Sequence, residues 1–299
     1  MPRSKALLFN YEGVRDFRFT MKSENSGIPD NQSEVRQNRR IKFKFKVPLF
    51  HKPNYKVLVG FKYYEEKFNF DDFSAGYHPI ETELEDKSLK SIGGAVYIIK
   101  PFMGNKYLVG KVKADISGDY NENVHVNDYL KVSVSGLYGI KSTISKSYGF
   151  GFSAGYNFGR PSIYPLVAYN KTFSSKWGVE SLLPSHIKLR HNISDKDILY
   201  LGTELHGNSF NLFFNDSTLS EIASPVYLQQ SEIRFFGTYE REIHDFLWFN
   251  ISAGLRENLE FTLSSNNSFK NDPFVDNDLG SSLFINASIF MVVPRKYIQ

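Results

Sequence analysis

Two short segments carry side chains that could act together in hydrolysis. Residues 151–155, Gly-Phe-Ser-Ala-Gly, match the G-x-S-x-G pattern, in which a serine nucleophile stands at a sharp turn between a strand and a helix. Further along, Glu204, His206 and Ser209 supply a carboxylate, an imidazole and a hydroxyl, the groups of a hydrolytic triad. Whether either segment forms a site depends on the elements that hold it.

Neither segment lies in an element that would assemble a catalytic site. Ser153 falls inside an alternating run over residues 148–158, and not at a strand-to-helix turn. Residues three apart in a strand point to opposite faces, so His206 and Ser209 cannot meet within one strand. We therefore predict no enzyme activity and no catalytic residue.

Evidence for a metal, a cofactor or a nucleic acid is equally weak. Asp272, Asp276 and Asp278 could offer oxygen ligands to Ca²⁺, but their spacing differs from that of an EF-hand loop, and a solvated acidic loop is the simpler interpretation. The chain has no cysteine, which excludes thiolate metal sites and disulfides. With 36 Lys+Arg against 32 Asp+Glu, the net charge of +4 is too small to favour nucleic acid. We predict no metal, no cofactor and no nucleic-acid partner.

Alternation with a period of two runs through almost the whole chain. Ile41, Phe43 and Phe45, for example, alternate with Lys42 and Lys44. Each such run predicts a strand with one apolar and one polar face, and no segment has a convincing helical period. The pattern predicts fourteen strands, at residues 14–22, 39–48, 55–67, 88–101, 107–118, 129–141, 147–158, 163–172, 176–182, 186–192, 197–207, 227–241, 246–257 and 282–293.

The segments between these strands indicate the topology. Short turns, such as residues 50–54 and 142–147, alternate with long polar stretches, such as 23–38 and 208–225. This alternation is typical of an all-β, up-and-down antiparallel barrel with short turns at one rim and long loops at the other. We predict one barrel domain over residues 1–299, with residues 1–13 as an N-terminal periplasmic segment. Twelve strands is the alternative, if weak strands merge.

Composition favours a barrel that spans a membrane. Aromatic residues make up 16% of the chain, yet the mean hydropathy is −0.35 and no apolar run reaches the roughly 18 residues of a membrane helix. Alternating strands reconcile these values, because only one face of each strand meets lipid. Aromatic residues near strand ends suggest an aromatic girdle: Tyr55, Tyr63, Tyr107, Tyr148, Phe158, Tyr164, Trp177, Tyr200 and Trp248. The apolar run at residues 6–9 is too short for a signal peptide, so we expect the precursor to begin upstream.

If the apolar faces point to lipid, the polar faces line a basic lumen. The inward carboxylates on this phasing are few: Asp16, Asp115, Glu204, Glu232 and Glu240. The inward basic residues are Arg18, Lys22, Lys141 and a set predicted to line the lumen, namely Lys42, Lys44, Lys46, Lys56, Lys62, Lys111, Lys113, Lys131, Lys188, Arg190, Arg234 and Arg256. A narrow lumen with this excess would favour small anionic solutes through field focusing.

One part of the chain resembles a known family. Pro165-Leu-Val-Ala-Tyr169, Lys176-Trp-Gly-Val-Glu180, Leu182-Leu-Pro184 and the run from Ile198 to Ser209 are similar to a family of outer-membrane β-barrel proteins of unknown function from the Bacteroidota. The resemblance implies a barrel fold, an outer-membrane location and outer-membrane lipid as its surroundings. It implies no reaction, substrate or site residue.

The sequence leaves three functions open. The first is a channel or transport-related barrel with a basic, anion-favouring lumen. The second is an occluded structural or surface-binding barrel that acts through long extracellular loops. The third and weakest is an outer-membrane lipid hydrolase, for which His206 and Ser209 would be the candidates.

Overall fold

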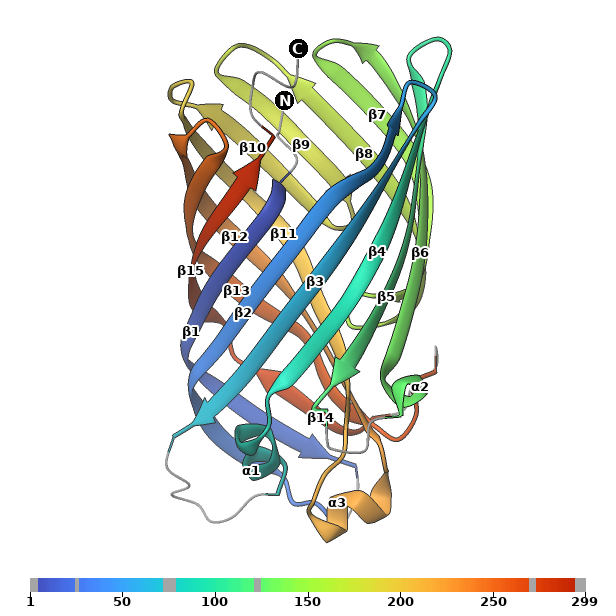
Figure 1. Cartoon of the computed structure of the whole chain (residues 1–299). Coiled ribbons are helices and arrows are strands. Elements are labelled where there is room, and N and C mark those ends of the chain that lie inside the picture. The colour runs from blue at the N-terminus through green and yellow to red at the C-terminus, as the bar shows by residue number, and fades with distance from the viewer. Residues whose placement is uncertain (1–4, 25–26, 72–78, 121–124, 269–272, 294–299) are drawn as a thin grey trace.

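The chain folds into a single barrel that surrounds a partly filled interior (Figure 1). The computed structural model describes residues 5–24, 27–71, 79–120, 125–268 and 273–293. Its strands are β1 (Lys5–Ser23), β2 (Asn31–Lys52), β3 (Tyr55–Phe70), β4 (Leu89–Phe102), β5 (Lys106–Gly118), β6 (Leu130–Thr143), β7 (Lys146–Asn157), β8 (Arg160–Thr172), β9 (Trp177–Leu183), β10 (His186–Asn192), β11 (Asp197–Leu212), β12 (Val226–His244), β13 (Leu247–Ser264), β14 (Pro273–Leu279) and β15 (Ser282–Val292). Three short helices, α1 (Pro79–Asp86), α2 (Val126–Tyr129) and α3 (Ser217–Ile222), lie in the long loops.

The sheet is antiparallel between sequence neighbours and closes on itself. β14 and β15 are two halves of one barrel strand, because both pair with β1 on one side and with β13 on the other. The ring therefore has fourteen strands, which confirms the predicted up-and-down barrel of about fourteen strands over the alternative of twelve. Pro184 stands in the turn between β9 and β10, so residues 176–192 form a hairpin.

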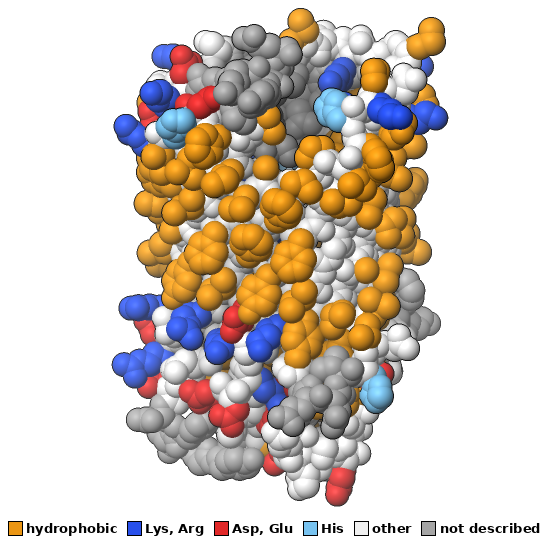
Figure 2. All heavy atoms as spheres, viewed as in Figure 1, with side chains coloured by type: hydrophobic (Ala, Val, Ile, Leu, Met, Phe, Trp, Pro, Cys, Tyr) orange, Lys and Arg blue, Asp and Glu red, His pale blue; other side chains and the backbone are white. Residues whose placement is uncertain are grey.

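Apolar side chains cover the outside of the barrel as a belt (Figure 2). In β6, Val132 and Val134 are 41% and 51% exposed, whereas Lys131 and Ser133, which alternate with them, are buried. This is the inverse of a soluble barrel, which buries its apolar face, and it is the arrangement of a barrel in a membrane. Among the described residues, no helix is long and apolar enough to cross a membrane.

The long loops lie at one rim and the short turns at the other. Figure 1 shows α1, α2 and α3 at the end of the barrel opposite to the two chain ends. The first and last described strands meet at the rim of the chain ends, where Lys5 lies opposite Val292. In bacterial barrels the short turns are periplasmic and the long loops extracellular, so we call the two rims periplasmic and extracellular.

A line of irregularities crosses neighbouring strands and reverses which residues face inward. In β1, Val14 and Phe17 are both buried with two exposed residues between them, and the second of these, Asp16, has a φ of 49°. β2 is interrupted in the same way at Arg36, β13 has a register shift at Leu259, and Gly280 separates β14 from β15. Beyond this line the inward face becomes apolar.

Two sequence predictions about the first strand are therefore wrong. Phe17, Phe19 and Met21 point into the barrel, and Arg18 and Lys22 are exposed on its outside, because the conformation at Asp16 shifts the alternation by one residue. The strand also begins at Lys5, so residues 5–13 are barrel wall and not a separate periplasmic segment.

The extracellular half of the interior is filled by an apolar plug. Its wall residues include Phe17, Phe19 and Phe261, and the helices add Ile80, Leu84 and Leu219, all at most 2% exposed. Polar contacts hold α1 in place. The Glu81 carboxylate accepts hydrogen bonds from Asn31 Nδ2 at 2.9 Å and from Ser33 Oγ at 2.6 Å.

The barrel narrows towards the extracellular rim. β9 and β10 have seven residues each, so their hairpin stops short of the extracellular ends of the neighbouring strands. Beyond this hairpin β11 reaches across to β5, where Asn211 pairs with Gly118 in a parallel bridge. The approach requires a glycine, because a Cβ on Gly118 would lie 2.3 Å from the backbone oxygen of Asn211. A smaller circumference at this end leaves less volume for the plug to fill.

The belt yields a test of the fold and of its orientation in the membrane. We expect Val134→Arg, near the middle of β6, to destabilise the barrel in phosphatidylcholine vesicles. The free energy of unfolding should fall by about 2–4 kcal/mol, because a cation at the centre of the bilayer is poorly solvated. Leu130→Arg, on the same face at the extracellular end of β6, is the matched control and should cost about 0–1 kcal/mol. Urea titration monitored by tryptophan fluorescence measures both values. Equal losses would contradict the placement of the belt.

Candidate functional site

The periplasmic half of the interior holds two cavities that share several wall residues. The first, of about 920 Å³, reaches the periplasmic rim at the turns around residues 175–176 and 192–195, and we call it the rim cavity. The second, of about 1040 Å³, is lined by residues of β1 to β11, with its lysines mainly on β2 to β6, and we call it the lysine cavity. Lys42, Lys44, Glu204 and His206 line both, so the two are adjoining parts of one lumen.

Lysines dominate the lysine cavity because neighbouring strands place them in the same inward phase. Among the described residues, eight lysines line it against two carboxylates. Lys113 Nζ is 2.8 Å from Asp115 Oδ2, and Lys62 Nζ is 3.7 Å from the same atom. One aspartate therefore serves two lysines, and the remaining cationic charge is not balanced by the wall.

Five lysines in this cavity have no ion pair with any described residue, and one of them, Lys131, donates a hydrogen bond to the uncharged side chain of Asn211. The other four are Lys42, Lys44, Lys46 and Lys111. Lys44 lies directly opposite Lys62 in the β2–β3 pairing, an arrangement of like charges that destabilises a sheet. The ring of Tyr97 offers partial compensation, since the ammonium groups of Lys46 and Lys111 lie 4.3 Å and 5.6 Å from its centroid.

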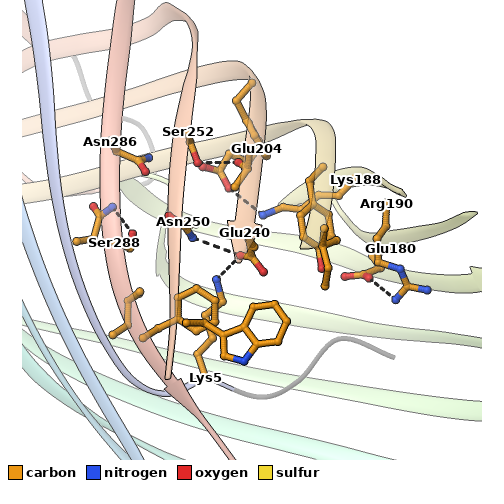
Figure 3. A pocket seen from close by; sticks show the side chains of 18 of the residues that line it. Lys5, Glu180, Lys188, Arg190, Glu204, Glu240, Asn250, Ser252, Asn286 and Ser288 are labelled. Carbon is orange, nitrogen blue, oxygen red and sulfur yellow. Dashed lines mark hydrogen bonds and ion pairs between the residues drawn. The ribbon is translucent and has the colours of Figure 1, made fainter. Parts of the chain in front are cut away.

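The rim cavity is more evenly charged (Figure 3). Lys5 from β1 and Asn250 from β13 both point to Glu240 on β12, with Lys5 Nζ 2.7 Å from its carboxylate. Arg190 Nη1 likewise lies 3.1 Å from Glu180 Oε1. Apart from Lys42 and Lys44, which also line the lysine cavity, most charged side chains of the rim cavity lie close to a group of opposite charge, so its excess of basic groups is smaller.

A buried ionic network separates the lumen from the apolar plug. It comprises Glu12, Arg40, Glu66, Glu232, Arg234 and Arg256, and each is at most 7% exposed. Glu232 lies at its centre. Its two carboxylate oxygens are 2.6 Å and 3.0 Å from the guanidinium of Arg40, and one of them is 3.5 Å from Arg256.

The network is charge-balanced and joined to the plug. Glu12 accepts two hydrogen bonds of 2.7 Å from Arg234, a bidentate arrangement that is among the stronger side-chain contacts. The guanidinium of Arg256 lies 4.3 Å from the ring centroid of Phe17, and that of Arg234 lies 5.0 Å from the ring centroid of Phe284. The arginines thus face carboxylates at their edges and plug aromatics at their flat faces.

The structure distributes the predicted lumen residues over these regions. Lys42, Lys44, Lys46, Lys62, Lys111, Lys113 and Lys131 line the lysine cavity, and Lys188, Arg190 and Arg234 line the rim cavity. Arg234 also belongs to the network, as does Arg256. Lys56 is half-buried and lines neither cavity, and Lys141 is exposed at the end of β6.

Five aromatic residues assigned to the outer girdle line the interior instead. Tyr200 and Trp248 line the rim cavity, and Tyr107, Phe158 and Tyr164 line the lysine cavity. Trp248 stacks on Phe290 with ring centroids 6.2 Å apart and is 4% exposed. Tyr55 and Trp177, which are 37% and 44% exposed, do lie on the outside. Proximity to a strand end therefore does not tell an aromatic girdle residue from a lumen aromatic.

The hydrolytic candidates are not assembled. His206 Nε2 lies 3.1 Å from Glu204 Oε1 inside the barrel, but the buried hydroxyl of Ser209 has no hydrogen-bond partner among the described residues. Ser153 is in the middle of β7, and its hydroxyl lies 2.8 Å from that of Ser135. Of the three loop aspartates, Asp272 lies outside the described residues, and Asp276 and Asp278 are exposed on β14.

Sequence reasoning missed half of the network. Glu12 falls in the segment that was expected to lie outside the barrel. Arg40 and Glu66 fall in predicted strands, and both share the inward phase of Lys42 and Lys62. Extending the alternation two residues beyond the lysines would therefore have placed Arg40 inside.

The fold and the interior together define the class of the protein. A closed antiparallel barrel with an even number of strands, an apolar outer belt and a charged interior is an outer-membrane β-barrel. No family model matches the sequence, and no curated protein matches it. The resemblance of residues 165–209 to a Bacteroidota family stays a prediction.

Several solved barrels are similar in fold at very low sequence identity. A FadL homologue of Pseudomonas aeruginosa aligns with a TM-score of 0.45 and 7% identity, over 97% of this chain and 90% of that one. An outer membrane channel from Pseudomonas putida F1 aligns with a TM-score of 0.46 and 10% identity, over 98% and 97%. The toluene transporter TodX of P. putida aligns with a TM-score of 0.38 and 6% identity, over 98% and 91%.

The network yields a second test. We expect Glu232→Gln to lower the free energy of unfolding by about 3–5 kcal/mol, because it removes the carboxylate shared by three buried arginines. Arg241→Gln breaks the pair with Asp197 at the periplasmic rim, where Arg241 is 56% exposed, and should cost less than about 1 kcal/mol. Urea titrations in one detergent compare the two variants. A loss below about 1 kcal/mol for Glu232→Gln would show that the network does not stabilise the barrel.

Proposed function

We propose that the protein is a transport-related barrel, closed at its extracellular side, whose lysine cavity concentrates small anionic solutes that enter from the periplasm through the rim cavity. The observation that supports this most directly is the lysine cavity, where Lys42, Lys44, Lys46 and Lys111 face the lumen with no carboxylate to neutralise them. Polar side chains that only fill space would be expected to pair, as those of the rim cavity do.

Field focusing is the physical reason why these lysines would act on a solute. The lumen is polar, but its wall is thin and surrounded by lipid, so the field of the lysines is confined to the cavity and attracts anions from the periplasm. Ammonium groups are point charges on flexible stems that can follow a moving anion. The lysine cavity is thus suited to transient binding and less suited to one rigid recognition geometry.

Passage through the barrel requires the plug to move. The apolar core fills the extracellular half, and the ionic network beneath it joins β2 to β12 across the interior. α1 and α3 belong to long loops, which open locally at lower free energy than the strands. The proposed channel is therefore closed in this conformation and opens when the helices leave the core.

A second function is favoured by the same plug. An interior packed with Phe19, Ile80 and Leu84, all fully buried, would also suit an occluded barrel that binds partners through its extracellular loops. In that case the only role of the lysines would be to keep the lumen filled with water. The two functions differ in what happens once the plug is removed.

Ion conductance separates these functions. We expect the native protein in planar bilayers to be almost non-conducting, and Ile80→Asp with Leu84→Asp to open it, because two carboxylates in the apolar core would expel α1. A KCl gradient across the opened barrel should give a reversal potential that indicates anion preference.

Two sets of substitutions in the opened barrel test the role of the lysine cavity. The combined variant Lys42→Gln, Lys44→Gln and Lys111→Gln should lose most of the anion preference, so that its reversal potential in the KCl gradient falls close to zero. The matched control replaces Lys100, Lys106 and Lys196, which are exposed and line neither cavity. Cation preference in the opened barrel would contradict the anion proposal, and absence of any current would favour the occluded barrel.

A further inference from the structure

A row of basic side chains crosses the outer surface just beyond the apolar belt. Arg15 on β1, Arg39 on β2 and Lys67 on β3 are exposed. The register sets them side by side, since Arg39 lies directly opposite Lys67, and Arg15 is two residues along β1 from Gly13, the residue opposite Arg39. Figure 2 shows blue side chains gathered directly below the orange belt, at the end of the barrel that carries α1 and α3. We call these three residues the outer basic row.

The protein itself neutralises this row only in part. Neither Arg15 nor Arg39 forms an ion pair with a described residue. Lys67 Nζ lies 3.6 Å from Glu65 Oε1, which also accepts a hydrogen bond of 2.6 Å from Ser88, so one carboxylate stands against three basic groups. Like charges directly opposite each other destabilise a sheet, so the pairing of Arg39 with Lys67 calls for an anion from outside the chain.

The position of the row indicates where that anion comes from. The last outward residues of the belt before the row include Tyr11 and Ile92, 42% and 37% exposed, and Tyr63. Aromatic residues of this kind stand at the level of the lipid headgroups. Because the row lies on the side of the long loops, it is at the headgroups of the outer leaflet. Gly13, opposite Arg39, has no atom within 4 Å of the place where a Cβ would be, which leaves open space beside the guanidinium.

We propose that the outer basic row binds the phosphate groups of the phosphorylated glycolipid that forms the outer leaflet. Arginine matches this ligand, because its planar guanidinium donates two parallel hydrogen bonds to a phosphate. The acyl chains of the same lipid would lie along the belt, so the site continues the membrane contact that the fold already makes. This site is on the outside of the wall and is independent of the lumen and of the proposed transport.

The affinity of the purified protein for lipid A tests the proposal. The probe is lipid A with two phosphates, and dephosphorylated lipid A is the comparison, both titrated into the full chain in detergent micelles. We expect the native protein to bind the phosphorylated form at least about tenfold more tightly. Arg15→Gln, Arg39→Gln and Lys67→Gln together should abolish that difference.

A matched variant distinguishes a site from general attraction. Lys100→Gln, Lys106→Gln and Lys196→Gln remove the same charge from other exposed positions and should leave the affinity within about twofold of the native value. The shift in gel mobility on heating verifies that each variant is a folded barrel. Equal binding of the two lipid forms by the native protein, or an equal loss in both triple variants, would overturn the proposal.

Discussion

The structure depends on closing a sheet whose outer face meets lipid. No water is available inside a bilayer to satisfy backbone N–H and C=O groups, so every strand within it needs a partner on both sides. β1 meets this need by pairing with β2 along one edge and with β15 along the other, where Leu7 to Val14 lie opposite residues 291 to 284. That last pairing removes both sheet edges. It also fixes which alternate residues of each strand face inward, and this decides which side chains enter the interior.

A ring of this size encloses more space than wall side chains can fill, since eight strands already suffice for a packed interior. The protein treats its two halves differently. At the extracellular end the one-residue shift at Asp16 turns apolar side chains inward, the ring narrows around α1 and α3, and the space becomes an apolar core. At the periplasmic end the space holds charged side chains around cavities. The buried network suits the boundary between these environments because arginine can pair with a carboxylate through its edge and cover an aromatic ring with its face.

Much of this could be predicted from alternation, and the failures have identifiable causes. Strict alternation over Ile41 to Val47 placed Lys42, Lys44 and Lys46 on the polar face, where the cavities lie. The same rule misplaced Arg18 and Lys22, because a shift of one residue at Asp16 is a backbone event that the apolar pattern on either side does not mark. The plug was not foreseen because it is built from inward residues at strand ends, such as Phe210 and Leu263, together with loop helices. Both residues fall in polar stretches between the predicted strands, and the helices were not predicted.

Arg39 and Arg40 show how strongly the role of a side chain depends on the face of the strand that carries it. They are neighbours in β2 and chemically identical. Arg40 points inward, is 6% exposed and contacts three carboxylates, so its charge is compensated within the protein. Arg39 points outward beside Lys67 and has no such partner among the described residues, so its charge is available to the surroundings. The lysines of the lumen resemble Arg39 in being uncompensated, but they face a cavity. The wall thus separates two cationic surfaces, one facing the lumen and one facing outward beside the apolar belt, with the compensated network between the lumen and the plug.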